Sequence, residues 1–104
     1  MKIKIIITTT DSKSLANKLA KNLVENNFSP CVQVIDNVSS TYKWGNKLLK
    51  EMELLLLIKT SINNLDNCKR SIKKIHNYDA PELITIESNI IEKKYEKWFK
   101  KLNF

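Results

Sequence analysis

The chain of 104 residues contains few of the residues that break, bend or cross-link a polypeptide. It has one glycine and two prolines, which argues against disorder and against a glycine-rich phosphate-binding loop. Its two cysteines, Cys31 and Cys68, are too few for a disulfide framework and are not spaced as a pair of metal ligands. We therefore expect a single domain, residues 1–104, whose thiols are reduced and whose core is made of apolar side chains.

Long apolar runs are also missing. The longest run, Leu54–Ile58, has the length of a strand and falls far short of the ~20 residues of a membrane span. The N-terminal run Met1–Ile7 is too short for a secretion signal, and no cleavage site of small residues follows it. The sequence therefore predicts a cytoplasmic protein that has no membrane partner.

Arginine is nearly absent although the formal net charge is +7, because Arg70 is the one arginine among 18 basic residues. Bidentate recognition of phosphate and guanine prefers arginine to lysine. Lysine, asparagine and isoleucine are abundant together, as expected for a composition bias that affects a whole proteome. We interpret the lysines as a solvated surface and predict no specific binding of nucleic acid.

The residues that are present follow two regular periods. An isoleucine-rich start predicts a strand with both faces buried, and Asp11 or Ser12 can cap the helix that follows. Three stripes have helical spacing. Their members are Leu15, Ala16, Leu19, Ala20, Leu23 and Val24; then Ile62, Leu65, Cys68, Ile72 and Ile75; and finally Tyr95, Trp98, Phe99 and Leu102.

A period of two replaces the helical period between residues 31 and 60, which predicts one long hairpin. Asp36-Asn37 interrupts the first strand as a bulge would, and Gly45-Asn46 suits a turn that needs positive φ. Leu54–Ile58 then predicts a buried strand. A half-exposed strand over residues 82–87 has the alternation expected at a sheet edge.

This order predicts an α+β fold: a ferredoxin-like βαββαβ unit with a long hairpin between its second and third strands and an extra C-terminal helix. Several chemistries occur on this fold, so the residues must distinguish them. The third strand has no aromatic platform for RNA bases. Neither a cysteine pair for copper transfer nor a glycine-rich, arginine-bearing loop for acyl phosphates follows the first strand. We predict that the protein is not an enzyme.

The candidate functional residues gather in the helix-to-strand loop that begins at His76. Imidazole, phenol and carboxylate groups come from His76, Tyr78, Asp79 and Glu82, while Lys59 ends a neighbouring strand. Such groups can line a polar pocket for an ion or a small anion. The alternative is a hydrogen-bonded structural loop in which the imidazole caps a helix.

A series of motifs carries a family resemblance. They are Cys31-Val32, then Ser40, Tyr42 and Trp44, then Lys47 and Glu53, then Ile58-Lys59-Thr60, then His76-x-Tyr78-x-x-Pro81-Glu82, and last Tyr95-x-x-Trp98. In this order and spacing the chain resembles the CutA divalent-cation tolerance proteins over residues 3–104. The resemblance implies a homotrimer of ferredoxin-like subunits, similar in architecture to the PII signalling proteins, with no established catalytic activity.

The resemblance also implies a site for divalent metal ions, Cu²⁺ among them. Cys31 is expected as a soft ligand and His76 as a borderline one, with Lys59, Tyr78 and Glu82 shaping the pocket around them. Weak binding is expected, because the cysteine and the second histidine that are associated with copper in some bacterial members are here Thr8 and Ile75. Two other functions stay open: a PII-like module that binds a small anionic metabolite between subunits, and a purely structural trimer.

Overall fold

A computed structural model describes residues 1–102 of the chain, so the last two residues of the predicted domain lie outside the described part. The elements occur in the predicted order, with one short 3-10 helix in addition. They are β1 (Lys2–Thr10), α1 (Lys13–Glu25), β2 (Cys31–Trp44), β3 (Lys47–Thr60), η1 (Ile62–Asn64), α2 (Leu65–Ile75), β4 (Ile84–Asn89) and α3 (Lys93–Leu102).

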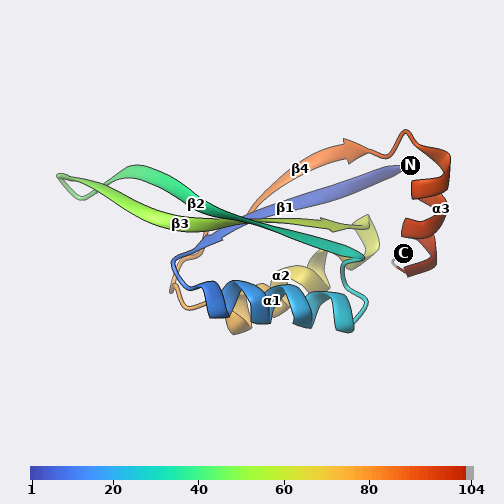
Figure 1. Cartoon of the computed structure of the whole chain (residues 1–104), viewed down its shortest axis with the longest axis horizontal. Helices are drawn as coiled ribbons and strands as arrows, with labels where there is room; N and C mark the ends of the chain where they lie inside the picture. Colours follow the sequence, from blue (N-terminus) through green and yellow to red (C-terminus); the bar gives the residue numbers. More distant parts are fainter. Residues whose placement is uncertain (103–104) are drawn as a thin grey trace.

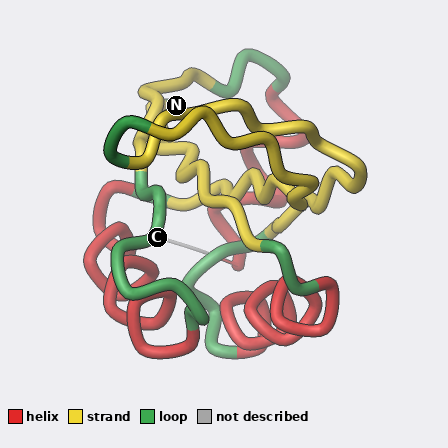
Figure 2. Tube along the Cα trace, turned by 90° about the vertical axis from the view of Figure 1, so that its left-hand side faces the viewer, coloured by secondary structure: helices red, strands yellow, loops and turns green. Residues whose placement is uncertain are grey.

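The strands form one antiparallel sheet in the order β2-β3-β1-β4. The two continuously apolar strands are therefore central, which confirms the predicted ferredoxin-like topology. Helices α1 and α2 lie side by side and cover one face of the sheet, while α3 lies at the end where β1 begins (Figure 1). Figure 2 shows the sheet as one layer and two of the helices as a second layer beneath it.

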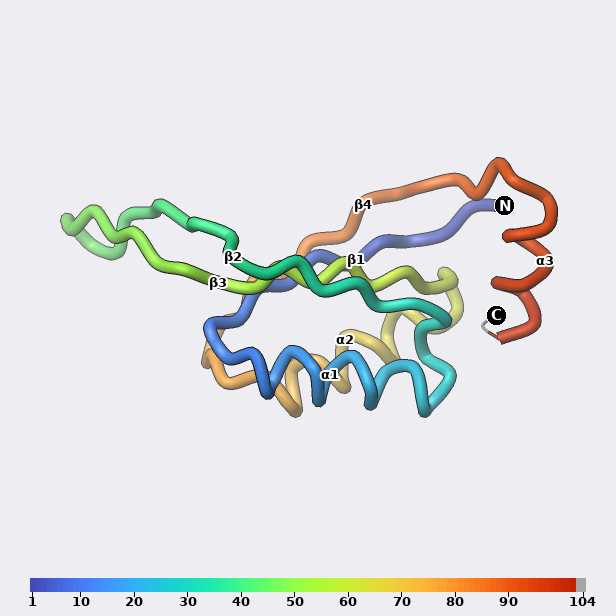
Figure 3. The backbone as a smooth tube through the Cα atoms, viewed as in Figure 1, coloured from blue at the N-terminus to red at the C-terminus, as the bar shows by residue number. Residues whose placement is uncertain are grey.

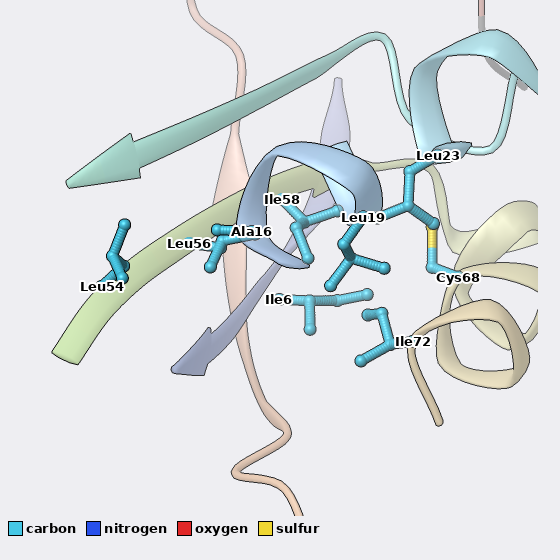
Figure 4. Packing of buried hydrophobic residues seen from close by; sticks show 9 residues of the cluster. All are labelled: Ile6, Ala16, Leu19, Leu23, Leu54, Leu56, Ile58, Cys68 and Ile72. Atoms are coloured by element: carbon cyan, nitrogen blue, oxygen red, sulfur yellow. The ribbon is translucent and has the colours of Figure 1, made fainter. Parts of the chain in front are cut away.

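The core lies between the sheet and the α1–α2 layer (Figure 4). It consists of Ile6, Ala16, Leu19, Leu23, Leu54, Leu56, Ile58, Cys68 and Ile72. The alternation of a strand places Leu54, Leu56 and Ile58 on the same face, where the helices cover them. Burial raises the pKa of the Cys68 thiol, which donates to the carbonyl oxygen of Phe28 at 3.3 Å. This cysteine is a core residue.

Three local signals have the predicted effect. The Ser12 hydroxyl caps α1 by accepting the Leu15 N–H at 3.2 Å. The register of β2 against β3 shifts between Ile35 and Val38, where Asn37 adopts a φ of 57°. Gly45 has a φ of 61° in the hairpin turn, which glycine adopts without a steric cost.

The predicted burial of β1 is wrong. β1 does not have both faces buried: Ile6 is buried under the helices, but Ile5 and Ile7 are only half-buried, because α1 and α2 cover only one face of the sheet. β4 is the half-exposed edge strand that the alternation predicts, and its Ile84 and Ile86 are exposed by 52% and 47%.

Ile62 is not part of the apolar stripe of α2. It lies in η1, which the Ser61 hydroxyl caps, and 57% of its surface is exposed. Helix α2 begins three residues later, so its buried stripe contains Cys68 and Ile72.

The outer half of the hairpin projects beyond the helices (Figure 3). Strands β2 and β3 have 14 residues each, and the subunit is elongated, with extents of 47 × 24 × 22 Å. Trp44, Leu48 and Met52 are exposed by 73%, 72% and 58%. We call residues 38–53 the hairpin arm.

Candidate functional site

The structure places the predicted site residues at two ends of the sheet. His76 contacts Thr9, which pairs with Leu55 of β3, whereas Cys31 pairs with Lys59 of the same strand. Four residues of a strand span about 13 Å. Cys31 and His76 therefore do not meet within one subunit.

The imidazole of His76 is held by hydrogen bonds on both sides. Its Nδ1 accepts the Tyr78 N–H at 3.0 Å, and its Nε2 lies 2.8 Å from the Thr9 carbonyl oxygen. A carbonyl oxygen can only accept, so Nε2 carries the proton and the ring is neutral. His76 is also the C-cap of α2, as the structural alternative predicted. A metal ion at His76 has to displace one of these two partners.

Asn77 joins the same loop to the end of β1. Its side-chain oxygen accepts from the Thr10 hydroxyl at 2.8 Å, and its side-chain nitrogen donates to Asp11 at 2.8 Å. The Thr10 hydroxyl in turn accepts the Ser12 N–H at 3.2 Å. Sequence reasoning missed this residue. The available signal was the polar run from Thr8 to Ser12, which needs partners when it folds against a loop.

Tyr78 connects the loop to the base of the hairpin arm. Its hydroxyl donates to a carboxylate oxygen of Glu53 at 2.7 Å, and only 8% of Glu53 is exposed. Burial, and next the hydrogen bond to Glu53, raise the pKa of Tyr78 well above its ordinary value. Glu53 faces Val38, the first β2 residue to pair after the bulge. We call the contacts of His76, Asn77 and Tyr78 the loop network.

A hollow of about 210 Å³ lies beside the loop network. It is lined by Asp11, Lys13, Asp36, Asn37, Met52, Glu53 and Leu54. Although three of these residues are carboxylates, residues 1–102 contain no group of three or more His, Cys, Asp or Glu side chains arranged to hold a metal ion.

The other end of the sheet holds Cys31 and Lys59. The buried Ser29 hydroxyl lies 2.6 Å from the Lys59 carbonyl oxygen and 3.0 Å from that of Cys31, so it joins the ends of both strands. The Lys59 ammonium lies 5.8 Å from the centre of the Tyr95 ring in α3, a cation–π distance. Glu82 lies exposed in the loop before β4. The structure therefore groups His76 with Tyr78 and Cys31 with Lys59.

The sheet face opposite the helices forms a third candidate surface. The register places Ile84, Ile7, Leu57 and Gln33 in one row across the four strands. Directly opposed side chains share a face of a sheet, so this face is apolar and uncovered in the subunit. We call it the open face.

Apolar side chains occur again on the same side of the hairpin arm. The alternation of β3 leads from Leu57 past the carboxylates of Glu53 and Glu51 to Leu49, and its partner Tyr42 shares this side, as does Trp44. Isolated subunits rarely expose an apolar surface of this extent. The arrangement therefore suits contact with another polypeptide.

None of the helices formed by residues 1–102 is long and apolar enough to span a membrane.

Comparisons with known proteins cover almost the whole chain. A sequence profile of the CutA1 divalent ion tolerance protein family matches residues 4–102. The divalent-cation tolerance protein CutA of Thermus thermophilus is 29% identical over 97 residues, which are 93% of this chain and 94% of the relative. The chloroplastic protein CutA of Arabidopsis thaliana is 29% identical over 96 residues, which are 92% of this chain but 53% of that longer relative.

Solved structures agree with the sequence comparison. The divalent cation tolerance protein Cut A1 of Thermus thermophilus superposes with a TM-score of 0.91 at 28% identity and covers 100% of both chains. CutA1 of Oryza sativa superposes with a TM-score of 0.92 at 29% identity, covering 99% of this chain and 94% of its own. The family is described by ion tolerance and not by a catalysed reaction. The chain belongs to the CutA1 divalent ion tolerance protein family.

Proposed function

We propose that the chain acts as a homotrimer in tolerance of divalent cations and binds Cu²⁺ or another divalent ion weakly, without catalysing a reaction. The observation that carries the assembly is the open face together with the apolar side chains of the hairpin arm, whose Trp44 is 73% exposed. These apolar surfaces need a cover, and a second copy of the chain supplies one with matching apolar residues.

A ring satisfies the two strand edges better than a two-fold dimer does. β2 and β4 are the two edges of the sheet, and each presents unpaired backbone groups on its outer side. When the arm of one subunit contacts the next subunit head to tail, the set closes into a ring if the rotation between subunits permits it. The resemblance to the CutA proteins supports a ring of three subunits.

Metal binding in this proposal is weak because the donors are few. His76 and Cys31 are the proposed ligands, and Lys59, Tyr78 and Glu82 shape the surroundings. The two ligands lie at different ends of one subunit, and both imidazole nitrogens already have partners. A bound ion therefore competes with the loop network at His76, or recruits donors from a neighbouring subunit.

Calorimetric titration with Cu²⁺ tests the metal proposal. We expect His76→Ala to weaken binding at least tenfold and Cys31→Ser to weaken it less. Asn77→Ala is the matched control, since it cuts contacts of the same loop but keeps the imidazole. Equal affinities for the wild type and His76→Ala would remove His76 from the site. Equal losses in His76→Ala and Asn77→Ala would assign the effect to the loop.

A PII-like role is the second candidate, favoured by the position of Lys59 on the open face. The ammonium of Lys59 is half-buried beside Tyr95, and assembly through the open face would bring it close to a neighbouring subunit. Thermal shift with citrate and ATP as anionic probes tests this role. A rise in melting temperature with either anion that Lys59→Ala abolishes supports the PII-like role. If neither citrate nor ATP raises the melting temperature, these anions are not ligands of the protein.

The proposed compartment is the cytoplasm. Relatives differ in this respect, since the Arabidopsis protein is named chloroplastic and a CutA protein of solved structure from Archaeoglobus fulgidus is named periplasmic. Fractionation of the source cells with an antibody to this chain tests the proposal.

A further inference from the structure

The positive charge of the molecule is concentrated on its helices. Helices α1, α2 and α3 have 13, 11 and 10 residues, and together they carry twelve of the 18 basic residues but three of the 11 acidic ones. The helices thus hold a net charge of +9, and the rest of the chain holds −2. A composition bias alone would raise lysine on every exposed surface, so it does not explain this separation.

Seven of these basic residues belong to α1 and α2, which lie side by side (Figure 1). They are Lys13, Lys18, Lys21, Lys69, Arg70, Lys73 and Lys74, and all of them are exposed. The same two helices carry only Glu25 and Asp66 as acids. We call the outer surface of these two helices the basic helix layer. It lies on the side of the subunit opposite the open face, so assembly through the open face leaves it accessible.

The basic side chains of α2 are not used by ion pairs within the subunit. Lys69 and Lys73 form one like-charged pair at i,i+4, and Arg70 and Lys74 form another, which costs roughly 0.2–0.5 kcal/mol per pair. Asp66 in the first turn and Lys73 and Lys74 in the last turn offset this cost, because they complement the helix dipole. The five ion pairs among residues 1–102 include none of the four basic side chains, and Arg70 donates to the neutral side chain of Asn67. Their charges are therefore available to an external anionic partner.

We propose that the basic helix layer binds the phosphate backbone of nucleic acid without sequence preference. Lysine acts as a flexible point charge, which suits phosphate contacts that release counterions and read no bases. The layer has a single arginine, Arg70, to read base edges, and α1 and α2 have no aromatic side chain to stack on bases. This inference is compatible with the prediction that specific nucleic-acid binding is absent.

An anionic membrane fits the surface less well. Peripheral helices insert tryptophan, phenylalanine or leucine between lipids, with lysines around them. Within α1 and α2 no aromatic residue occurs, and Leu19 and Leu23 of α1 are buried in the core. The exposed apolar side chain of α1 is the small Val24, so the lysines surround no large apolar group suited to insertion, which favours a polyanion that binds through charge alone.

Fluorescence anisotropy with a labelled 20-base-pair DNA duplex of random sequence tests the proposal. The test variant replaces Lys69, Arg70, Lys73 and Lys74 with Gln. The matched control replaces Lys93, Lys94, Lys97 and Lys100 of α3 with Gln, which removes the same total charge from a different surface. At 50 mM NaCl we expect the α2 variant to lose at least tenfold in affinity and the α3 variant less than threefold. The magnitude of the slope of log K against log[salt] should fall by up to about 3.6 in the α2 variant, since each of the four phosphate contacts contributes about 0.9.

Three outcomes would overturn the proposal. Equal losses in the two variants would show that total charge, and not the basic helix layer, attracts DNA. Lack of wild-type binding at 50 mM NaCl would remove nucleic acid as the partner. Tighter binding to vesicles of phosphatidylserine and phosphatidylcholine than to DNA would assign the surface to a membrane. If the α2 variant does not fold by circular dichroism, Lys18→Gln with Lys21→Gln on α1 provides the same test with two charges.

Discussion

The two halves of the β2–β3 hairpin have continuous backbone pairing but very different surroundings. In the inner half, Leu54, Leu56 and Ile58 lie beneath α1 and α2 with at most 6% of their surface exposed. In the hairpin arm, Trp44, Leu48 and Met52 are exposed by more than half. Pairing between strands thus extends well beyond the core that one subunit can supply. The inner half is stabilised by contacts within one chain, and we propose that contacts between chains stabilise the arm.

The largest expected effect is in the inner half. Leu56→Ala should reduce the free energy of unfolding by roughly 2–5 kcal/mol, because it leaves a cavity at a fully buried position. Urea unfolding at two subunit concentrations measures this loss, which should be the same at both. Leu48→Ala removes the same groups from the arm, which we propose to contact other copies of the chain. The reduction in the free energy of unfolding that it causes should therefore depend on subunit concentration. Concentration-independent losses in both variants would contradict the difference between the halves.

The next effect concerns assembly through the arm. Trp44→Ala should weaken association by about 2 kcal/mol, since buried tryptophans often dominate the energy of an interface. Trp98→Ala is the control, because its residue lies on α3 and is 41% exposed. Sedimentation velocity across a dilution series compares the two variants. A larger loss in Trp98→Ala would place the main contact at α3 and not on the arm.

The junction between the two halves should show a smaller effect. Tyr78→Phe removes the hydroxyl that pairs with the buried Glu53 carboxylate, at an expected cost of about 1–2 kcal/mol. Tyr95→Phe on α3 is the control. Equal losses in the two variants would show that the loop network does not support the arm base.

The Tyr78–Glu53 contact at this junction also predicts that the free energy of unfolding decreases at alkaline pH. The pKa of Tyr78 is raised in the folded protein, so above its ordinary value of about 10 the unfolded state loses the proton first. The stabilisation is therefore complete below pH ~10 and decreases as the pH rises toward the folded-state pKa. Burial and Glu51 raise the pKa of Tyr42 as well. Tyr78→Phe should therefore reduce the slope of the free energy of unfolding against pH but not abolish it. An unchanged slope in urea unfolding between pH 9 and 11 would contradict this assignment.

The smallest effect is expected at the tip of the arm. A Cβ on Gly45 would meet no atom within 4 Å, so Gly45→Ala tests only the backbone strain of a φ of 61°. That strain should cost about 1 kcal/mol. Gly45→Asn should recover part of it, because asparagine tolerates this region. A stability loss well above this size in Gly45→Ala would indicate that the tip itself makes a contact between chains.

The fold could be predicted from the sequence because its signals are local. The apolar run Leu54–Ile58, the bulge at Asp36-Asn37 and the turn at Gly45 are each readable within a few residues, and the structure confirms all three. Burial of each sheet face was less predictable. The isoleucines of β1 suit a buried strand whether helices or a second chain cover them.

The candidate site was less predictable because its contacts join distant parts of the chain. His76 reaches Thr9 across 67 residues, and Tyr78 reaches Glu53 across 25. Spacing in sequence does not show such contacts, so Asn77 was missed and Lys59 was not expected beside Tyr95. The family motif pointed to the loop that begins at His76, but the hydrogen bonds of that loop are a property of the three-dimensional structure.

Sedimentation equilibrium of the wild-type protein at micromolar concentration tests most directly the claim that the hairpin arm is covered by other copies of the chain. We predict a mass of three times 12.1 kDa that persists on dilution. A mass of one 12.1 kDa chain, with the circular dichroism of a folded protein, would contradict the account.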